Sequence, residues 1–150
     1  VTDDELVVAF LDMVENHKMI VENSGLLTVA ALKHLDVKDK RVVAILSGGN
    51  MDVITMSSVV QQGLIFRDRI FTVSVLLPDK PGELCKIAGT IAKEQGNVIK
   101  LEHNQFVTTN RNAAVELRIT LESFGTEHKK QIMKALEKNG YKPKLVRTSL

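Results

Sequence analysis

Two glycine-containing segments of the chain carry residue types that could hold a small ligand. The first is Ser47-Gly48-Gly49-Asn50, which directly follows an apolar run at residues 41–46. Open α/β sheets bind their ligands at the carboxyl ends of buried strands, and glycines let the backbone approach a flat or anionic group closely. These four residues are therefore a candidate binding loop, although a simple strand-to-helix turn explains them equally well.

The second segment is Asp79-Lys80-Pro81-Gly82-Glu83-Leu84, which joins a predicted strand to a predicted helix. The first amides of a helix have no partner within the helix, so they can hold a carboxylate. Pro81 stiffens the approach to the helix and Gly82 leaves space beside its first turn. We therefore predict an anion-accepting turn here, with a rigid turn that binds nothing as the alternative.

The other residue types that often carry chemistry form no recognisable set in the sequence. The chain contains four histidines without metal-ligand spacing and without paired cysteines (His17, His34, His103 and His128), so we predict no metal site. No histidine partner is evident for the single cysteine, Cys85, which we interpret as a packed and unreactive thiol. No Ser-His-Asp grouping is evident either.

Residues 1–66 show the alternation of helices and strands that is typical of an α/β domain. Apolar spacing predicts helices near residues 2–16, 24–34 and 57–62, and buried strands at 19–22 and 41–46. The run at 41–46 is apolar throughout, as in a strand covered by helices on both faces. Two strands make a poor sheet and the chain begins at Val1, so we interpret this segment as the end of a larger domain.

Residues 67–150 have a different pattern, in which strands alternate apolar and polar side chains. We predict strands at 71–77, 97–107, 115–121 and 141–147, helices at 84–95 and 126–139, and a hairpin turn at 108–112. Gly96 and Gly140 are expected to end the two helices in the left-handed conformation. The order βαββαβ is a ferredoxin-like α+β pattern, with both helices on one face of the sheet and water on the other.

Charge is unevenly distributed along the chain. Residues 1–68 hold ten acidic and six basic side chains, whereas residues 69–150 hold eight acidic and fourteen basic ones. Such a basic half raises the question of nucleic-acid binding. The chain has no tryptophan and only six Phe and Tyr residues to stack on bases, and several lysines lie on the predicted outer faces of helices (Lys129, Lys130, Lys134 and Lys138). We therefore predict no nucleic-acid partner.

The overall composition is that of an ordinary globular chain, with 44% apolar and 25% charged residues. No run approaches the roughly 18 apolar residues of a membrane span, so we predict no membrane insertion. A single cysteine fits a reducing compartment, and we expect the protein in the cytoplasm.

Both halves of the chain resemble parts of one enzyme family. The run VVAILSGGNMD at residues 42–52 resembles the cofactor segment near the C-terminus of threonine dehydratases (threonine ammonia-lyases), which are fold-type II pyridoxal-phosphate enzymes. Residues 20–31 look like the strand and helix that precede that segment. Residues 70–147 are similar to an ACT domain, a small-molecule sensor, through the Asp-Lys-Pro-Gly-Glu-Leu turn and the Gly96-Asn97-Val98-Ile99 segment.

The resemblance implies a division of the chain and a set of cofactor contacts. Residues 1–66 would be the C-terminal piece of the catalytic domain, and residues 67–150 the ACT regulatory domain. In the family, the serine that matches Ser47 hydrogen-bonds the pyridine nitrogen of pyridoxal phosphate, and an acidic residue that matches Glu22 lies near the cofactor. Gly48, Gly49 and Asn50 would line the edge of the ring.

The resemblance also implies an effector site between two copies of the ACT domain. Asp79, Pro81, Gly82 and Leu84 would form the turn side in one copy of a homodimer. Asn97, Val98 and Ile99 would form the strand side in the other copy. The effector would be an amino acid, with isoleucine expected and valine, threonine or serine as alternatives.

One part of the family pattern lies outside these residues. The Schiff-base lysine and the phosphate-binding glycine loop of the family lie far upstream, and no lysine here matches that motif. We therefore expect no catalytic residue in this chain and no reaction from it alone. A free-standing amino-acid-binding module, or the sensor of a transcription regulator, is the alternative that the second half alone would fit.

Overall fold

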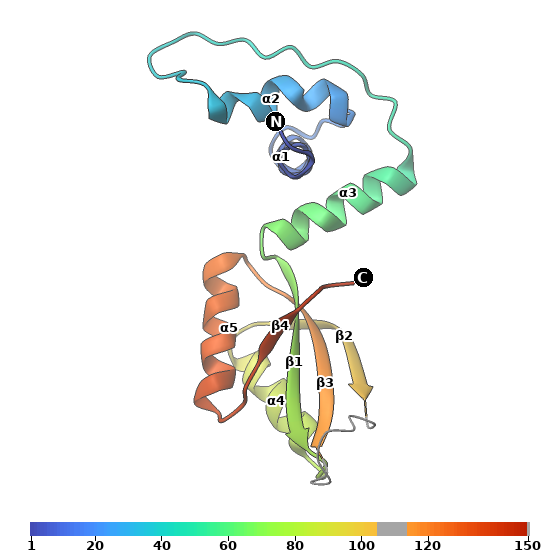
Figure 1. Cartoon of the computed structure of the whole chain (residues 1–150), viewed down its shortest axis with the longest axis vertical. Coiled ribbons are helices and arrows are strands. Elements are labelled where there is room, and N and C mark those ends of the chain that lie inside the picture. The colour runs from blue at the N-terminus through green and yellow to red at the C-terminus, as the bar shows by residue number, and fades with distance from the viewer. Residues whose placement is uncertain (105–113, 150) are drawn as a thin grey trace. The chain divides into compact units, whose positions relative to one another are not determined.

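The computed structural model describes residues 1–104 and 114–149, which form two compact units (Figure 1). The first unit comprises residues 1–66 and the second comprises residues 67–150. Each unit has a hydrophobic core of its own.

The first unit is helical. It contains α1 (Asp3–Asp12), a π-helical turn (Met13–His17), α2 (Leu27–Ala31) with short 3₁₀ turns on either side (Asn23–Leu26 and Leu32–His34), and α3 (Val53–Phe66). Thr2 caps α1, because its hydroxyl accepts from the Glu5 amide while the Glu5 carboxylate accepts from the Thr2 amide. The core contains Phe10 and Leu26, both fully buried, and Val59 of α3.

The two strands predicted for the first unit are wrong. Residues 19–22 and 41–46 are extended but belong to no ladder, and Val43 and Ile45 are 88% and 73% exposed. A strand needs neighbours that accept and donate its backbone hydrogen bonds, and no described segment pairs with residues 41–46 in a sheet. The helix predicted at 57–62 is longer than expected and corresponds to α3.

The second unit is a four-stranded antiparallel sheet with two helices. Its elements are β1 (Ile70–Pro78), α4 (Glu83–Lys93), β2 (Asn97–Asn104), β3 (Ala114–Glu122), α5 (Thr126–Lys138) and β4 (Lys144–Val146). The strand order is β2-β3-β1-β4, so β2 and β4 form the edges. This arrangement confirms the predicted ferredoxin-like βαββαβ fold, while the hairpin turn predicted at 108–112 lies outside the described residues.

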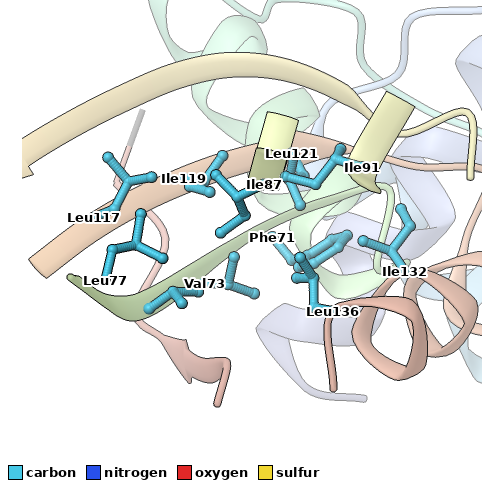
Figure 2. Close-up of a cluster of buried hydrophobic side chains, with 11 residues drawn as sticks. Phe71, Val73, Leu77, Ile87, Ile91, Leu117, Ile119, Leu121, Ile132 and Leu136 are labelled. Carbon is cyan, nitrogen blue, oxygen red and sulfur yellow. The ribbon is translucent and has the colours of Figure 1, made fainter. Parts of the chain in front are cut away.

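Both helices of the second unit contribute to one core on a single face of the sheet (Figure 2). Alternate residues of β1 and β3 point into it, as the predicted strand patterns require. They meet Ile87 and Ile91 of α4 and Ile132 and Leu136 of α5, and all four are essentially inaccessible to solvent. The burial of these branched side chains fixes which sheet face the helices cover. No helix of the second unit covers the other face, although Thr72 and Thr120 are buried there and hydrogen-bond each other.

The end of α4 differs from the prediction for Gly96. Gln95, with φ of 62°, is the residue in the left-handed conformation, and Gly96 follows it. The amides of Gln95 and Gly96 donate to the carbonyls of Ala92 and Ile91, which is a Schellman ending. Gly96 is needed for another reason, because a Cβ there would lie 2.8 Å from Cγ2 of Ile91. Gly140, with φ of 84°, does end α5 as predicted.

The prediction that Lys129 lies on the outer face of α5 is wrong. The Lys129 ammonium is 2.7 Å from the Asp68 carboxylate and 5.5 Å from the centre of the Phe71 ring. Asp68 also accepts a hydrogen bond from the Thr126 hydroxyl. Burial raises the pKa of the Asp68 carboxyl, but the hydrogen bonds from Lys129 and Thr126 and the Lys129 charge outweigh it, so the pKa is lowered.

Candidate functional site

The turn between β1 and α4 borders a cavity of about 370 Å³, called here the turn cavity. Its wall is formed by residues 77–84, and three residues of the neighbouring strands complete it (His103, Val115 and Leu117). Leu77, Val115 and Leu117 are buried and give it an apolar floor. The rim is polar and charged. The cavity could therefore contact both the charged groups and the apolar side chain of an amino acid.

The local backbone explains why the helix start is open to a ligand. Pro78 ends β1, and its carbonyl accepts from the amide of Lys80 to close the turn. Gly82 precedes α4 with φ of 89° and offers no side chain to cap the helix. A Cβ on Gly82 would have no atom within 4 Å. The Glu83 amide donates to the Lys80 carbonyl, whereas the space beside Gly82 at the start of α4 is open.

The charges at the rim are partly paired. The Lys86 ammonium is 2.6 Å from the Glu83 carboxylate, and this hydrogen bond and charge raise the pKa of Lys86. Burial, followed by the Glu83 charge, raises the pKa of Tyr141 nearby. The four residues predicted for the turn side, Asp79, Pro81, Gly82 and Leu84, all line the turn cavity.

The residues predicted for the strand side lie elsewhere. Asn97 begins β2 and pairs with Glu122, which in turn pairs with Ile70 at the start of β1. The turn cavity follows the end of β1, so Asn97 and the turn cavity lie at opposite ends of the same sheet. Val98 and Ile99, beside Asn97, are 37% and 43% exposed. Within one chain, the structure does not bring the two predicted halves of the site together.

His103 is a lining residue that the sequence reasoning did not single out. It pairs with Leu117 across β2 and β3, so both side chains lie on the helix-covered face. A bulge between Val98 and Lys100 shifts the alternation of β2, and strict alternation counted from Asn97 therefore assigns His103 to the wrong face.

In the first unit, the structure places Glu22 beside the Ser47-Gly48 segment. The Glu22 amide donates to the Gly48 carbonyl over 3.1 Å, and the Ser24 hydroxyl donates to the Glu22 carboxylate over 2.6 Å. Gly48 has φ of 79°, and a Cβ on it would lie 2.3 Å from Oε1 of Glu22. The positive φ favours glycine at that position, and a side chain there would also displace the Glu22 carboxylate.

The other predicted residues of this loop are less closely placed. A Cβ on Gly49 would have ordinary contact with the Ile20 carbonyl at 3.7 Å. Ser47 and Asn50 are exposed. The loop thus presents an exposed serine and two residues without side chains, Gly48 and Gly49, which leaves space for the flat edge of an aromatic ring. The lysines of the first unit are Lys18, Lys33, Lys38 and Lys40, and none of them lies in the lysine motif of the family.

The described residues contain neither a metal-binding cluster nor a membrane-spanning helix. Within residues 1–104 and 114–149, no three His, Cys, Asp or Glu side chains gather closely enough to hold a metal ion. None of the helices in this described part is both long and apolar enough to cross a membrane. Cys85 is exposed rather than packed, which corrects the expectation of a buried thiol.

The comparison with family models concerns the sheet, its helices and the turn cavity. Residues 71–140 match the model described as the ACT domain. This segment is an ACT domain. The match runs from β1 through α5, so it includes the β1–α4 turn and β2, and it ends before β4.

The whole chain is similar to L-threonine ammonia-lyases. It is 34% identical over 143 residues to the one from Geobacter sulfurreducens and 31% identical over 147 residues to the one from Thermotoga maritima. These alignments cover 94% and 97% of this chain, so they extend beyond the ACT domain into the first unit. They cover 36% and 37% of the two relatives, so the chain spans about a third of their length.

A solved structure also aligns with part of the chain. The ACT domain of prephenate dehydrogenase from Bacillus anthracis covers 49% of this chain and 99% of its own length, with 20% identity and a TM-score of 0.38.

Proposed function

We propose that the chain is the regulatory end of a pyridoxal-phosphate-dependent threonine dehydratase, the enzyme that converts L-threonine to 2-oxobutanoate and ammonia. The ACT domain binds an amino acid, and residues 1–66 are the C-terminal piece of the catalytic domain. The observation that carries the proposal is that similarity to threonine ammonia-lyases extends through both units. A free-standing sensor would leave the similarity of the first unit unexplained.

The turn cavity supplies the chemistry for capturing an amino acid. Its volume of about 370 Å³ lies at the lower end of the range typical of small-molecule pockets. The amides that follow Glu83 at the start of α4 would donate to the carboxylate. The apolar floor of Leu77, Val115 and Leu117 would contact an aliphatic side chain. An aliphatic amino acid uses both features, so isoleucine is the proposed effector, with valine, threonine and serine as alternatives.

A second copy of the chain would complete the site. β2 is an edge strand, and Val98, Ile99 and Leu101 expose apolar area along it. If two β2 strands pair antiparallel about a two-fold axis, the start of one lies beside the end of the other. Asn97 of one copy would then approach His103 and the turn cavity of the other copy. The register of β2 thus supports a homodimer in which each effector contacts both chains.

Regulation would follow from linkage. An amino acid that binds between two ACT domains favours the subunit arrangement in which both halves of the site meet. If the catalytic domains differ in activity between two subunit arrangements, an effector that binds one arrangement more tightly would shift the enzyme toward it. The size of this shift would be set by the difference between the effector's affinities for the two arrangements.

The first unit would contribute to the cofactor site from one side. Pyridoxal phosphate, when bound, withdraws electrons from the substrate. The Ser47 hydroxyl would hydrogen-bond the pyridine nitrogen, which leaves the ring a milder electron sink than a carboxylate partner would. Gly48, Gly49 and Asn50 would line the ring edge, and Glu22 would hold the loop through its amide. The Schiff-base lysine would come from upstream residues, so these 150 residues alone would not convert threonine.

Calorimetric titration tests the sensor directly. Isoleucine, valine, threonine and serine are added separately to the chain, with D-isoleucine as the stereochemical control. We expect saturable heat with L-isoleucine and none with D-isoleucine. An absence of heat with all four L-amino acids at millimolar concentration would contradict the assignment of an amino-acid sensor. Analytical ultracentrifugation of the Leu101→Lys variant tests the edge, because a charge there should shift the chain toward monomer.

The enzyme assignment has its own test. The complete gene product should contain an upstream lysine that binds pyridoxal phosphate, and it should release ammonia from threonine. A gene product whose upstream residues bind no pyridoxal phosphate would contradict the catalytic part of the proposal, even if the sensor binds isoleucine.

A further inference from the structure

A second cavity, of about 510 Å³, lies on the sheet face that the helices leave open. We call it the outer-face cavity, and it is lined by Ser74, Leu76, Glu116, Gly140, Lys142, Lys144 and Val146. It shares no lining residue with the turn cavity. The ACT family match ends at residue 140, so its two lysines lie beyond the matched segment.

Strand register explains why these side chains share a face. Ser74 pairs with Lys144, and Leu76 pairs with Glu116. Paired residues of antiparallel strands point to the same side of a sheet. Val73 and Val75, which alternate with Ser74 along β1, are buried in the helix-covered core. The lining side chains of β1, β3 and β4 therefore point away from α4 and α5.

The negative charge in this cavity is already compensated. The Ser74 hydroxyl donates to Oε1 of Glu116 over 2.6 Å, and Nε of Arg118 lies 3.3 Å from the same oxygen. The hydrogen bond from Ser74, and then the Arg118 contact, lower the pKa of the Glu116 carboxyl. Glu116 is therefore an anion that is already paired with one cation, Arg118.

The positive charge is not compensated. Lys142 and Lys144 flank Pro143 and are exposed, and no ion pair joins either of them to a residue in the described part of the chain. Two ammonium groups on one rim attract a carboxylate. Leu76, which is 57% exposed, and Val146 give the same cavity an apolar patch. A ligand that satisfies both features has one carboxylate and a short aliphatic chain.

We propose that the outer-face cavity binds a short aliphatic carboxylate that lacks an α-ammonium group, with Lys142 and Lys144 holding the carboxylate and Leu76 and Val146 covering the aliphatic chain. The turn cavity takes an amino acid, whereas this cavity discriminates against one, because an α-ammonium group would meet two lysines and a glutamate that is already paired. The chain then has two sites on opposite faces of one sheet, with different charge requirements.

The test uses the chain of residues 1–150 and amide chemical shifts measured by NMR. The probes are isovalerate, its uncharged amide isovaleramide, and valine, which adds the α-ammonium group. We expect saturable shifts with isovalerate at the amides of Ser74, Leu76 and Val146, and much weaker ones with isovaleramide and valine. The variant Lys142→Gln/Lys144→Gln should bind isovalerate about tenfold more weakly. Lys138→Gln, an exposed lysine of α5 outside the cavity, is the matched control and should bind as the parent does.

Several results would overturn the inference. Equal binding of isovaleramide would show that the lysines do not select a carboxylate. Shifts centred on Gly82, Glu83 and Leu84 would place isovalerate in the turn cavity, and equal binding of valine at Ser74 and Leu76 would remove the discrimination against ammonium. The absence of saturable shifts at millimolar isovalerate would show that the outer-face cavity does not bind this carboxylate. Each of these results leaves amino-acid binding in the turn cavity untouched.

Discussion

The backbone of Gly25 lies against Ser47 so closely that a Cβ atom on residue 25 would come within 1.7 Å of the Ser47 carbonyl oxygen. The obstacle is main chain, which cannot rotate away as a side chain can. The Thr28 hydroxyl donates to the Ile45 carbonyl before Ser47, and the Glu22 amide donates to the Gly48 carbonyl after it. The segment is therefore attached on both sides of this contact. Gly25 therefore sets how near the candidate cofactor loop lies to the helical turn.

Replacement of Gly25 should disturb this loop. Gly25→Ala must push the Ser47 backbone away, and we expect a loss of about 1–3 kcal/mol in the free energy of unfolding of the first unit. Urea unfolding followed by NMR signals from residues 1–66 measures it. Gly49→Ala is the control, because its nearest atom would be at 3.7 Å, and it should change the free energy by less than about 0.5 kcal/mol. Equal effects of both variants would contradict the contact.

Two glycines of the ACT domain should respond to alanine with opposite signs. A Cβ on Gly96 would crowd Cγ2 of Ile91 at 2.8 Å and Cδ1 of Ile132 at 3.0 Å, whereas Gly89, inside α4, has no atom within 4 Å of that position. Gly96→Ala should cost about 1–2 kcal/mol, and Gly89→Ala should stabilise the domain by about 0.5–1 kcal/mol. Thermal unfolding of the two variants measures both changes, and a stabilising Gly96→Ala would refute the packing described here.

The Asp68–Lys129 pair should make the stability of the ACT domain sensitive to acid. The pKa of Asp68 is lower in the folded chain than its ordinary value. The pair therefore contributes fully above the ordinary pKa of an aspartate, near 4, and this contribution is lost as the pH falls through the lowered folded value. Unfolding free energies measured from neutral to acid pH should show a smaller decline in Asp68→Asn.

A matched ion pair on the same helix provides the control for that experiment. Lys130 and Glu127 are also 2.7 Å apart, but their side chains are 59% and 83% exposed, against 19% and 25% for Lys129 and Asp68. Solvent screens the exposed pair more strongly. Double-mutant cycles should therefore give a larger coupling for Asp68–Lys129, and equal couplings would mean that burial does not strengthen it.

Gly82→Asp should weaken amino-acid binding in the turn cavity. The substitution adds a carboxylate where the ligand carboxylate would approach the α4 amides, and there is room for it because no atom lies within 4 Å of the Cβ position. Gly82→Asn has nearly the same size and suffers the same backbone strain at φ of 89° without the charge. Calorimetry should show at least about tenfold weaker binding for Asp than for Asn. If both bind alike, the ligand carboxylate lies elsewhere.

Ser47→Ala should lower turnover in the complete enzyme while cofactor binding persists. In the proposed role, the hydroxyl would tune the ring through its nitrogen, whereas the upstream lysine and phosphate loop would hold the cofactor. Cofactor absorbance measures retention and ammonia release measures turnover. An unchanged rate would contradict the role proposed for Ser47.

The sequence predicted the ACT domain well because the apolar side chains of its central strands lie on one face of the sheet. In β3, Val115, Leu117, Ile119 and Leu121 alternate with polar residues, and this pattern determines both the element and its inner face. Residues 41–46 were predicted wrongly for the converse reason. Their apolar composition predicts that these residues are buried. It does not show which segment would pair with them as a neighbouring strand.

The candidate sites were predictable only where local sequence determines them. Gly82 and Pro81 specify a turn by their own conformations, and the turn cavity forms there. The alternation of Lys100, Leu101 and Glu102 is compatible with His103 on the helix-covered face, but nothing in the sequence shows that this part of β2 borders the turn cavity. Lys129 was placed in water because lysines usually are, and only the tertiary position of Asp68 brings it inward.

The separation of Asn97 from the turn cavity, at opposite ends of one sheet, bears on how a response would depend on protein concentration. A ligand that requires both ends is held by a pair of chains, so its apparent affinity should rise with the amount of protein present. At protein concentrations below the dissociation constant of the dimer, the chain would then lose effector binding, although each separate chain would still be folded.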